Sequence, residues 1–472
     1  MIGIGLLVML FVVLVMLIIM TYYLREVSRQ NETDHVEEVT EPANKIKILN
    51  TQTYIYTGII LTSIAIVVVI YLLVKGTPWE SHLMEWMNIV VRWMHITFGI
   101  AWIGASFYFV FLENALNRTK DLRDELAGNL WAVHGGGFYY LEKYKVAPKK
   151  IPKDLHWFKY EAYFTWVSGF CLLFIVYYFN ASALLIDKNI MDITPLTGVG
   201  IGVGSFIVAW VLYDLLCKSP IGKKSIPFTI IGTLIAIGFA YFYTKVFAPR
   251  AAYIHFGAML GSIMVANVFF VIIPSQKAMV KAARANQPLN PELGKNAGSR
   301  SLHNNYFTLP VLFVMISNHF PSTFGYKYPW LILSLITLGA AGVKHYLNLK
   351  EKGQLSVWVM PVSILILLGA AFISAPPKNP GECNEVISIN EVTQIVNKRC
   401  ITCHSATPTD EFYKTAPNGV MFDTPESIFK KKDLIMQRVV ITKTMPQNNK
   451  TNITQEERDK IRCWIEQGGS TK

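Results

Sequence analysis

The chain has 472 residues, of which 52% are hydrophobic and only 16% are charged, and its mean hydropathy is +0.33. Soluble domains typically carry about 25% charged residues, so this composition excludes an ordinary soluble enzyme, a disordered protein and a fibrous repeat. It indicates a polytopic membrane protein. The formal net charge is +12, and six cysteines are too few for a disulfide scaffold in a chain of this length.

The apolar residues gather into about ten stretches, most of them long enough to cross a hydrocarbon core of about 30 Å. These stretches cover residues 2–24, 54–74, 88–112, 162–186, 195–216, 226–244, 254–274, 306–320, 329–343 and 356–375. The first has no basic start and no small-residue cleavage site, so we interpret it as a retained helix. No stretch alternates with a period of two, which argues against a membrane β-barrel.

The character of the chain changes after residue 375. Residues 376–382 form a polar linker rich in proline, and residues 383–472 are polar enough and numerous enough for one small soluble domain. The predicted fold class is therefore all-α. An extra pair of membrane helices lies within residues 1–75, a polytopic membrane domain covers 76–375, and the small domain covers 383–472.

The basic residues predict a membrane topology. If the loops alternate sides and the C-terminal domain lies outside, the inward loops are 25–53, 113–161, 217–225, 275–305 and 344–355. They carry 24 Lys and Arg residues, against five in the outward loops. This bias agrees with the positive-inside rule and places the domain and both termini on the outer, periplasmic side of a bacterial inner membrane. The positive charge then reflects topology and gives no support for nucleic-acid binding.

The strongest motif is Cys400-Ile401-Thr402-Cys403-His404, the C-x-x-C-H signature of covalent c-type haem attachment. The two thiols bind the haem vinyl groups and His404 reaches the iron, because one helical turn brings all three together. The alternatives are a chance match, a thioredoxin-like redox pair and half of a zinc site. The domain has no second CxxC or HxxxH pair and no βαβ context, so we interpret it as a class I-like cytochrome c domain with one haem c.

A second axial ligand is expected downstream of the motif. Met445 is the preferred candidate, because the following proline stiffens the loop that would hold its thioether, and Met436 and Met421 are the alternatives. The pair Thr454 and Glu457 predicts a capping box at the start of a closing helix. That helix is expected to pack against a helix over residues 388–399.

Two further cysteines lie in the same domain, at Cys383 and Cys463. In an oxidising compartment they could form a disulfide that ties the end of the linker to the last helix. Two free thiols are the alternative.

Polar groups inside apolar spans are costly and are therefore candidates for function. Arg92 and His95 share one helix face near the outer end of a span, and His255 and His319 lie at the outer ends of two others. We predict that these four residues surround one catalytic pocket. Histidines that only bond to neighbouring helices are the alternative, and two facing histidines could also hold a b-type haem. A further set of polar groups lies deeper or nearer the inner face: Asn267, His303, Asn304, Asn305, His345 and Asp214.

The run His134-Gly135-Gly136-Gly137 is similar to a lipase oxyanion motif, but the chain has no G-x-S-x-G nucleophile elbow to accompany it. We therefore assign it no catalytic role.

The sequence resembles the bacterial membrane-bound urate hydroxylases, which are urate oxidases with a fused cytochrome c. The resemblance covers about residues 84–472. It rests on the stretches 92–95, 101–108, 133–139, 157–163, 303–310, 317–319 and 400–404. That family has about eight spans before the cytochrome, so the N-terminal pair is a departure and remains without an assigned role.

The resemblance implies oxidation of urate to 5-hydroxyisourate, with electrons passed to the attached haem and on to cytochrome oxidase or another respiratory acceptor. A buried arginine with histidine and asparagine donors suits a planar anion, and a histidine could take up a proton as water adds. Two other functions remain open. One is a respiratory electron-transfer subunit that relays electrons from quinol or b-haem without urate chemistry. The other is a transporter or sensor whose cytochrome reports redox state.

Overall fold

The computed structural model describes residues 77–375 and 383–470 apart from 120, 149, 153–154, 355 and 384, together with a few positions between 58 and 74. The apolar stretch 2–24, most of the stretch 54–74 and the whole linker 376–382 lie outside the described residues. The chain divides into two compact units. Unit 1 contains Met1–Phe179 and Val265–Leu302, and unit 2 contains Asn180–Met264 and His303–Lys472.

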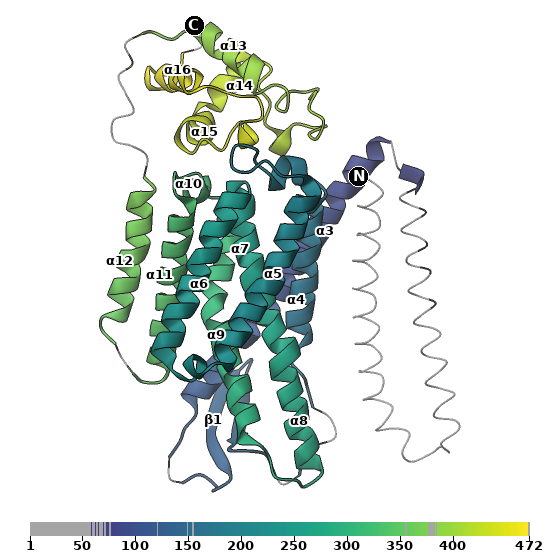
Figure 1. The fold of residues 1–472 in the computed structure, drawn as a ribbon, viewed down its shortest axis with the longest axis vertical. Coiled ribbons are helices and arrows are strands. Elements are labelled where there is room, and N and C mark those ends of the chain that lie inside the picture. The colour runs from purple at the N-terminus through teal and green to yellow at the C-terminus, as the bar shows by residue number, and fades with distance from the viewer. Residues whose placement is uncertain are drawn as a thin grey trace. The chain divides into compact units, whose positions relative to one another are not determined.

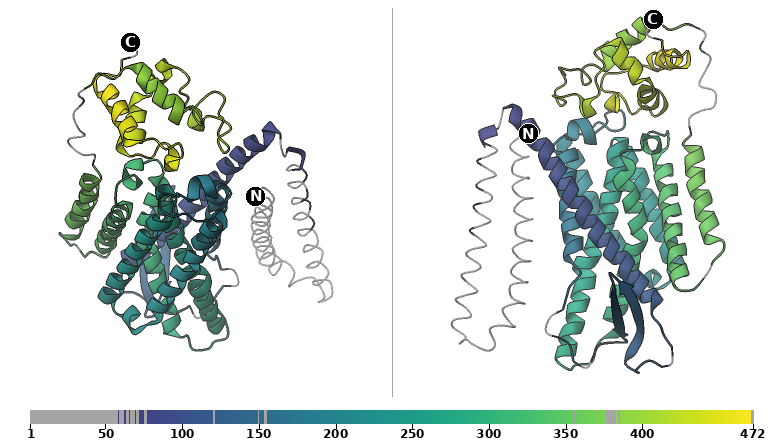
Figure 2. Two further views of the ribbon diagram at one scale, coloured as in Figure 1. Left: turned by 45° about the horizontal axis from the view of Figure 1, so that its top comes forward. Right: turned by 180° about the vertical axis from the view of Figure 1, so that it is seen from behind.

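The helices of unit 1 begin with α3 (Pro78–Ala115), whose first turn starts with a proline directly after Thr77. It is one uninterrupted helix in the right-hand view of Figure 2 and packs along α4 (Tyr160–Leu172). The rings of Phe98 and Phe164 stack across this interface, with centroids 5.1 Å apart. α4 continues as a wider π-helical turn, η1 (Leu173–Tyr178). A second π-helical turn, η4 (Asn267–Ile272), leads into α8 (Ile273–Arg284).

Unit 1 also contains a β-hairpin, so the all-α prediction is wrong for this segment. Strands β1 (Leu126–His134) and β2 (Gly137–Tyr144) pair antiparallel with His134 opposite Gly137. The two residues between them, Gly135 and Gly136, have φ angles of 58° and 80°. Glycine takes positive φ at little steric cost, and two such residues make the tight turn that matches the twist of paired strands. The glycines of this motif therefore serve a turn.

Unit 2 contains a bundle of helices that are connected in part by short helical turns. The helices are α5 (Pro195–Lys218), α6 (Ser225–Val246), α7 (Pro249–Ala266), α9 (Pro291–Ser317), α11 (Pro329–Glu351) and α12 (Val359–Ile373). The short turns are η2 (Ala181–Leu185), η3 (Pro220–Lys223) and α10 (Pro321–Phe324). α6 packs against both α5 and α11, and α12 packs against α11 (Figure 1). Helices α7 and α9 each run through a boundary between the units.

Among the described residues, six helices are long and apolar enough to cross a membrane. They are His82–Ala115, Tyr160–Tyr178, Pro195–Lys218, Ser225–Val246, Pro249–Arg284 and Pro329–Glu351, and the shorter Val359–Ile373 is also apolar. Each overlaps a predicted span. The predicted span 306–320 falls on α9, which is not among the six. Its first turns are polar and it contains Pro310. The predicted total of ten spans stays a prediction.

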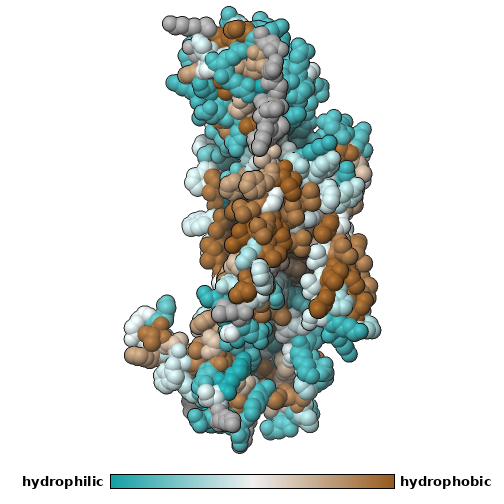
Figure 3. Space-filling model, turned by 90° about the vertical axis from the view of Figure 1, so that its left-hand side faces the viewer, coloured by the Kyte–Doolittle hydropathy of each residue, from teal (hydrophilic) through white to brown (hydrophobic). Residues whose placement is uncertain are grey.

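The outer faces of these helices are apolar. On α12, the side chains of Leu365 and Phe372 are 65% and 78% exposed. Figure 3 shows hydrophobic side chains gathered into a broad patch on the face that it presents. Broad exposed apolar patches are rare on soluble monomers, and such a surface suits contact with lipid.

The C-terminal domain, residues 383–470, has a hydrophobic core of its own. Its elements are α13 (Ile389–Arg399), η5 (Pro417–Gly419), α14 (Pro425–Lys430), α15 (Lys432–Ile435), η6 (Met436–Ile441), η7 (Gln447–Asn449) and α16 (Gln455–Glu466). Val392, Ile428, Ile461 and Trp464 are almost completely buried in one cluster. The predicted contact between the first and last helices is confirmed, since α13 packs against α16.

Candidate functional site

The C-x-x-C-H motif lies on the turn that ends α13. The amide of Cys400 donates to the carbonyl of Val396 at 2.7 Å, and the amide of His404 donates to the carbonyl of Cys400 at 2.9 Å. This continuous turn keeps the two thiols and the imidazole within one short segment. Cys400 and Cys403 are free thiols and half-buried, not joined to each other.

The imidazole of His404 is held in a defined orientation. Its Nδ1 lies 2.9 Å from the carbonyl oxygen of Val420, and its ring packs near that of Phe422, with centroids 5.4 Å apart. A carbonyl oxygen only accepts, so Nδ1 carries the proton and Nε2 keeps its lone pair. Metal-binding histidines usually donate their other N–H in this way. The donor set therefore fits an axial haem ligand.

The two thiols do not have the character of a redox pair. Burial raises the pKa of Cys400 to about 12 and that of Cys403 to about 11, and the negative charge of Asp410 adds to the effect at Cys403. Catalytic CxxC pairs depend on a thiolate with a lowered pKa. Within the described residues, no group of three or more His, Cys, Asp and Glu side chains gathers as a metal site would require.

Met445 lies in a loop, and both its backbone amide and its backbone carbonyl are hydrogen-bonded. Its amide donates to the carbonyl of Arg438 at 3.0 Å, and its carbonyl accepts from the buried guanidinium of Arg458 at 2.9 Å. The Met445 side chain is partly buried against the core. By contrast, the side chain of the alternative Met421 is 43% exposed. The structure thus gives Met445 the anchored setting that an axial thioether needs, while its role as a ligand stays a prediction.

The helix that closes the domain is secured by the predicted capping box and by an ion pair. The hydroxyl of Thr454 accepts from the amide of Glu457, and the Glu457 carboxylate accepts from the Thr454 amide at 2.8 Å. Arg399 on α13 donates to both carboxylate oxygens of Glu457, at 2.9 to 3.1 Å. Burial acts to raise the pKa of Glu457, but the hydrogen bonds from Arg399 and Thr454 outweigh it and lower the pKa.

The predicted disulfide is present. Cys383 and Cys463 are bonded, with their Cα atoms 5.4 Å apart. The bridge joins the first described residue after the linker to α16, across 80 positions of sequence.

The predicted pocket residues Arg92 and His95 belong to unit 1 and differ in setting. The expectation of a buried arginine is wrong, because Arg92 is exposed on its helix, and its guanidinium donates to the side-chain oxygen of Asn88 at 3.1 Å. His95 is half-buried, with Nδ1 3.0 Å from the carbonyl of Thr165 and 3.2 Å from the hydroxyl of Ser168. In the neutral ring, Nδ1 therefore carries the proton, and Nε2 is the nitrogen that can accept one.

The other two predicted residues, His255 and His319, belong to unit 2. His255 is completely buried in α7, where Nδ1 lies 2.8 Å from the carbonyl of Ala251 and the ring lies 4.5 Å from that of Phe247. His319 is exposed just after the end of α9. These two histidines therefore differ in exposure more strongly than Arg92 and His95 do. Their gathering into one catalytic pocket stays a prediction.

Two buried asparagines, which nothing in the sequence indicates as a pair, form a polar contact. Asn348 of α11 donates to the side-chain oxygen of Asn305 of α9 at 3.0 Å. The remaining amide atoms, Nδ2 of Asn305 and Oδ1 of Asn348, are buried without a hydrogen-bond partner. Unpaired buried amides are rare and mark places where water or a polar ligand would be stabilised. Asn348 lies five residues beyond the predicted apolar span 329–343, among charged residues, so no local signal in the sequence singled it out.

Two histidines on the same helices, each within three residues of one of these asparagines, bond to tyrosines. Nδ1 of His303 lies 2.8 Å from the hydroxyl of Tyr213, and Nδ1 of His345 lies 2.7 Å from that of Tyr306. These contacts match the alternative in which histidines hold neighbouring helices together.

The segment after Met445 contacts the turn η2 within unit 2. The side chain of Asn448 donates to the carbonyls of Ala183 and Ile186, at 3.1 and 2.8 Å. Gln447 donates to the same Ala183 carbonyl at 2.8 Å. These carbonyls end a short π-helical turn and would otherwise need other donors. The proposed haem-ligand loop is thus joined to the apolar bundle of its own unit.

Comparison with known proteins adds a family to this geometry. The sequence model of the family described as Urate oxidase N-terminal matches residues 81–375, which is more than half of the chain. The chain belongs to this family. Comparisons with curated proteins and with solved structures find no match.

Membership of the Urate oxidase N-terminal family indicates an oxidoreductase that acts on urate. The matched residues contain all six of the apolar helices described above. They also contain His95, Asn305 and Asn348, whereas the C-x-x-C-H turn lies beyond them. The family match and the cysteine motif therefore fall on separate parts of the chain.

Proposed function

We propose that this chain is a membrane-bound urate hydroxylase that oxidises urate to 5-hydroxyisourate and delivers the electrons to a covalent c-type haem of its own. The observation that carries the proposal is the joining, in one chain, of the urate oxidase family region with a folded domain that presents a C-x-x-C-H turn. A c-type haem accepts and releases single electrons, which suits transfer to a terminal oxidase or another respiratory acceptor.

In the C-terminal domain, the proposed ligand set is Cys400, Cys403, His404 and Met445. The thiols would attach the group, and His404 would bind the iron through Nε2, because Nδ1 is held by the Val420 carbonyl. Met445 would supply a thioether to the iron from a loop whose backbone is hydrogen-bonded. The support lies in the fixed ring of His404 and in the hydrogen-bonded backbone of Met445.

The reaction consumes one water and releases two protons and two electrons from each urate. His95 is proposed to accept a proton at Nε2, since its other ring nitrogen is engaged by Thr165. Arg92 supplies the positive charge that a urate anion requires, and His255 and His319 complete the proposed set. A membrane haem b is a further proposal that rests on the buried His255 and the half-buried His95.

The proposed location is the bacterial inner membrane, with the C-terminal domain on the periplasmic side. Six apolar helices and the bias of basic residues toward alternate loops support it.

The deciding experiment is reduction of the haem by urate alone. Purified full-length protein, kept free of oxygen and of other donors, is mixed with urate while the c-type absorption bands are recorded. The proposal expects the bands to change from the oxidised to the reduced form, with 5-hydroxyisourate appearing. A haem that dithionite reduces but urate does not would overturn the proposal and favour the electron-relay function.

Two variants locate the site within this assay. Arg92→Ala is expected to abolish reduction by urate and to leave haem attachment intact. Arg123→Ala is the matched control, because it removes another exposed arginine of unit 1, one that pairs with carboxylates of the hairpin segment. Equal activity of the two variants would remove Arg92 from the proposed pocket.

A further inference from the structure

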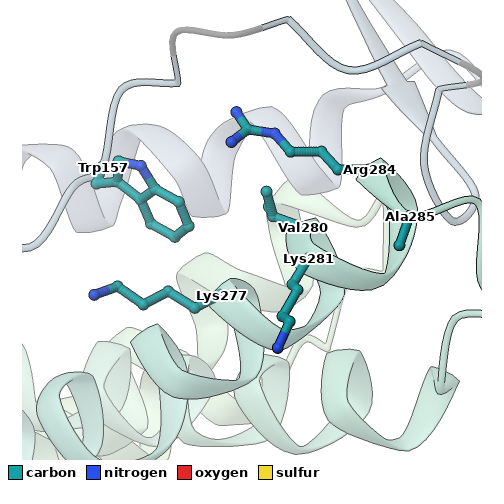
Figure 4. Close-up of a pocket in the computed structure, with 6 residues that line it drawn as sticks. All are labelled: Trp157, Lys277, Val280, Lys281, Arg284 and Ala285. Atoms are coloured by element: carbon teal, nitrogen blue, oxygen red, sulfur yellow. The ribbon is translucent and has the colours of Figure 1, made fainter. Parts of the chain in front are cut away.

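A basic pocket lies in unit 1, away from every residue assigned to urate or haem. It has a volume of about 470 Å³ and lies between Trp157, which precedes α4, and one face of α8 (Figure 4). The α8 residues that line it are Lys277, Val280, Lys281 and Arg284, and Ala285 follows them. Figure 4 shows the Lys277 side chain extending alongside the Trp157 ring, and the Arg284 side chain across the pocket from Lys277.

The pocket is positively charged. Lys277, Lys281 and Arg284 lie four and three residues apart, which places them on one face of the helix. Among the residues that the structure describes, no carboxylate lines the pocket. The guanidinium of Arg284 also donates to the carbonyl of Pro152 at 3.1 Å, which holds it at the rim. Such a site has the charge to bind a phosphate or another anion.

The pocket also has an apolar side. α8 is the last part of the apolar helix Pro249–Arg284, so its basic residues begin where the apolar run ends. Trp157 is half-buried and packs against a small core that contains Ala162, Val268 and Ile273. Tryptophan and long basic side chains are typical of the boundary between hydrocarbon and head groups. A ligand here would meet charge at one end and apolar surface at the other.

We infer that this pocket binds the head-group phosphate of an anionic phospholipid. The inference rests on the membrane location given under the proposed function, which places residues 113–161 and 275–305 on the inner side, where anionic lipids attract basic residues. A lipid matches both sides of the pocket, because its phosphate meets the basic residues while its chains follow the apolar helix. A free phosphate ion would match only the charge.

The test compares lipid retention by two variants of equal charge. The pocket variant changes Lys277, Lys281 and Arg284 to Gln. The control variant changes Lys218, Lys223 and Lys224 to Gln; these residues also follow an apolar helix in a predicted inward loop but line no described pocket. Full-length proteins are reconstituted in bilayers of equal phosphatidylglycerol and phosphatidylcholine. The lipids retained on each protein are then counted by native mass spectrometry.

Wild type and the control variant are expected to retain phosphatidylglycerol in preference to phosphatidylcholine. The pocket variant should lose at least about fivefold of that preference, which is the fold-change expected if only one of the three residues contributes its about 1 kcal/mol near an anionic surface. Equal retention by the pocket variant and wild type would overturn the inference, as would an equal loss in the control variant. Stabilisation of wild type by inorganic phosphate, without any lipid preference, would also overturn it and assign a free-anion site.

Reduction of the haem by urate is measured on the same samples. Because lipid retention needs neither urate nor haem, a protein that keeps its lipid preference but fails to oxidise urate would overturn only the proposed function.

Discussion

The contact between Asn448 and the turn η2 predicts how strongly the C-terminal domain is coupled to its bundle. The Asn448 side chain donates two hydrogen bonds, to the carbonyls of Ala183 and Ile186. The backbone of Asn448 has a φ angle of 52°, which alanine would adopt only with strain. Asn448→Gly therefore removes the amide group while it keeps the backbone conformation.

The expected loss follows from the two bonds. Each hydrogen bond contributes about 1 kcal/mol net, so the contact weakens by about 2 kcal/mol. At about 1.4 kcal/mol per factor of ten, the equilibrium constant for docking falls about 30-fold. The bond from Gln447 to the Ala183 carbonyl remains, so the docked state is less populated but still forms.

Stopped-flow absorption measures the consequence. Urate-driven reduction of the haem is expected to slow by up to about 30-fold in Asn448→Gly. Reduction by dithionite, which needs no contact with η2, is expected to stay at the wild-type rate. Asn452→Gly is the matched control: Asn452 has a φ angle of 54° but an exposed side chain. If urate reduces the haem of both variants at the same rate, the contact between Asn448 and η2 does not control electron transfer to the haem.

Three further predictions concern stability and packing. Glu457→Gln keeps the capping box but loses the ion pair with Arg399, so the domain should lose about 2 kcal/mol at pH 7 in denaturant unfolding. Because the folded pKa of Glu457 lies below its ordinary value of 4.5, the wild-type advantage should be complete above about that pH and vanish as the pH falls through the lower folded pKa. Cys383→Ser opens a bridge that spans 80 positions and should cost about 4 kcal/mol, seen as a lower denaturant midpoint. Gly169→Ala would place a Cβ 2.8 Å from the His95 ring, so it should impair urate oxidation, whereas unchanged turnover would show that His95 can move without consequence.

The parts of the structure that the sequence predicted well are those set by local spacing. The C-x-x-C-H turn and the capping box at Thr454 depend on residues within five positions of each other, so their geometry follows from one helical turn. Long apolar runs predicted the six helices for the same reason, since length and composition decide whether a helix can cross a membrane.

The parts that were missed depend on contacts between distant segments or on a turn of unusual conformation. The hairpin required Gly135 and Gly136 to be recognised as a turn, because its strands are too exposed to alternate strongly. The amide pair of Asn305 and Asn348 joins two helices 43 positions apart, which no local pattern reveals. The exposure of Arg92 also depends on packing, because a charged residue within an apolar run can face either the bundle or its surroundings.

The disulfide of the C-terminal domain has a mechanical consequence. Cys383 is the point at which any pull through the preceding segment reaches the domain, and its sulfur is bonded to α16, the last helix. Force applied at Cys383 is therefore transmitted through the disulfide to α16, whose residues Ile461 and Trp464 are buried in the core. The first residues of the domain are then not detached before the core itself is disrupted. The bridge therefore keeps the first residues of the domain attached to its last helix when force reaches Cys383.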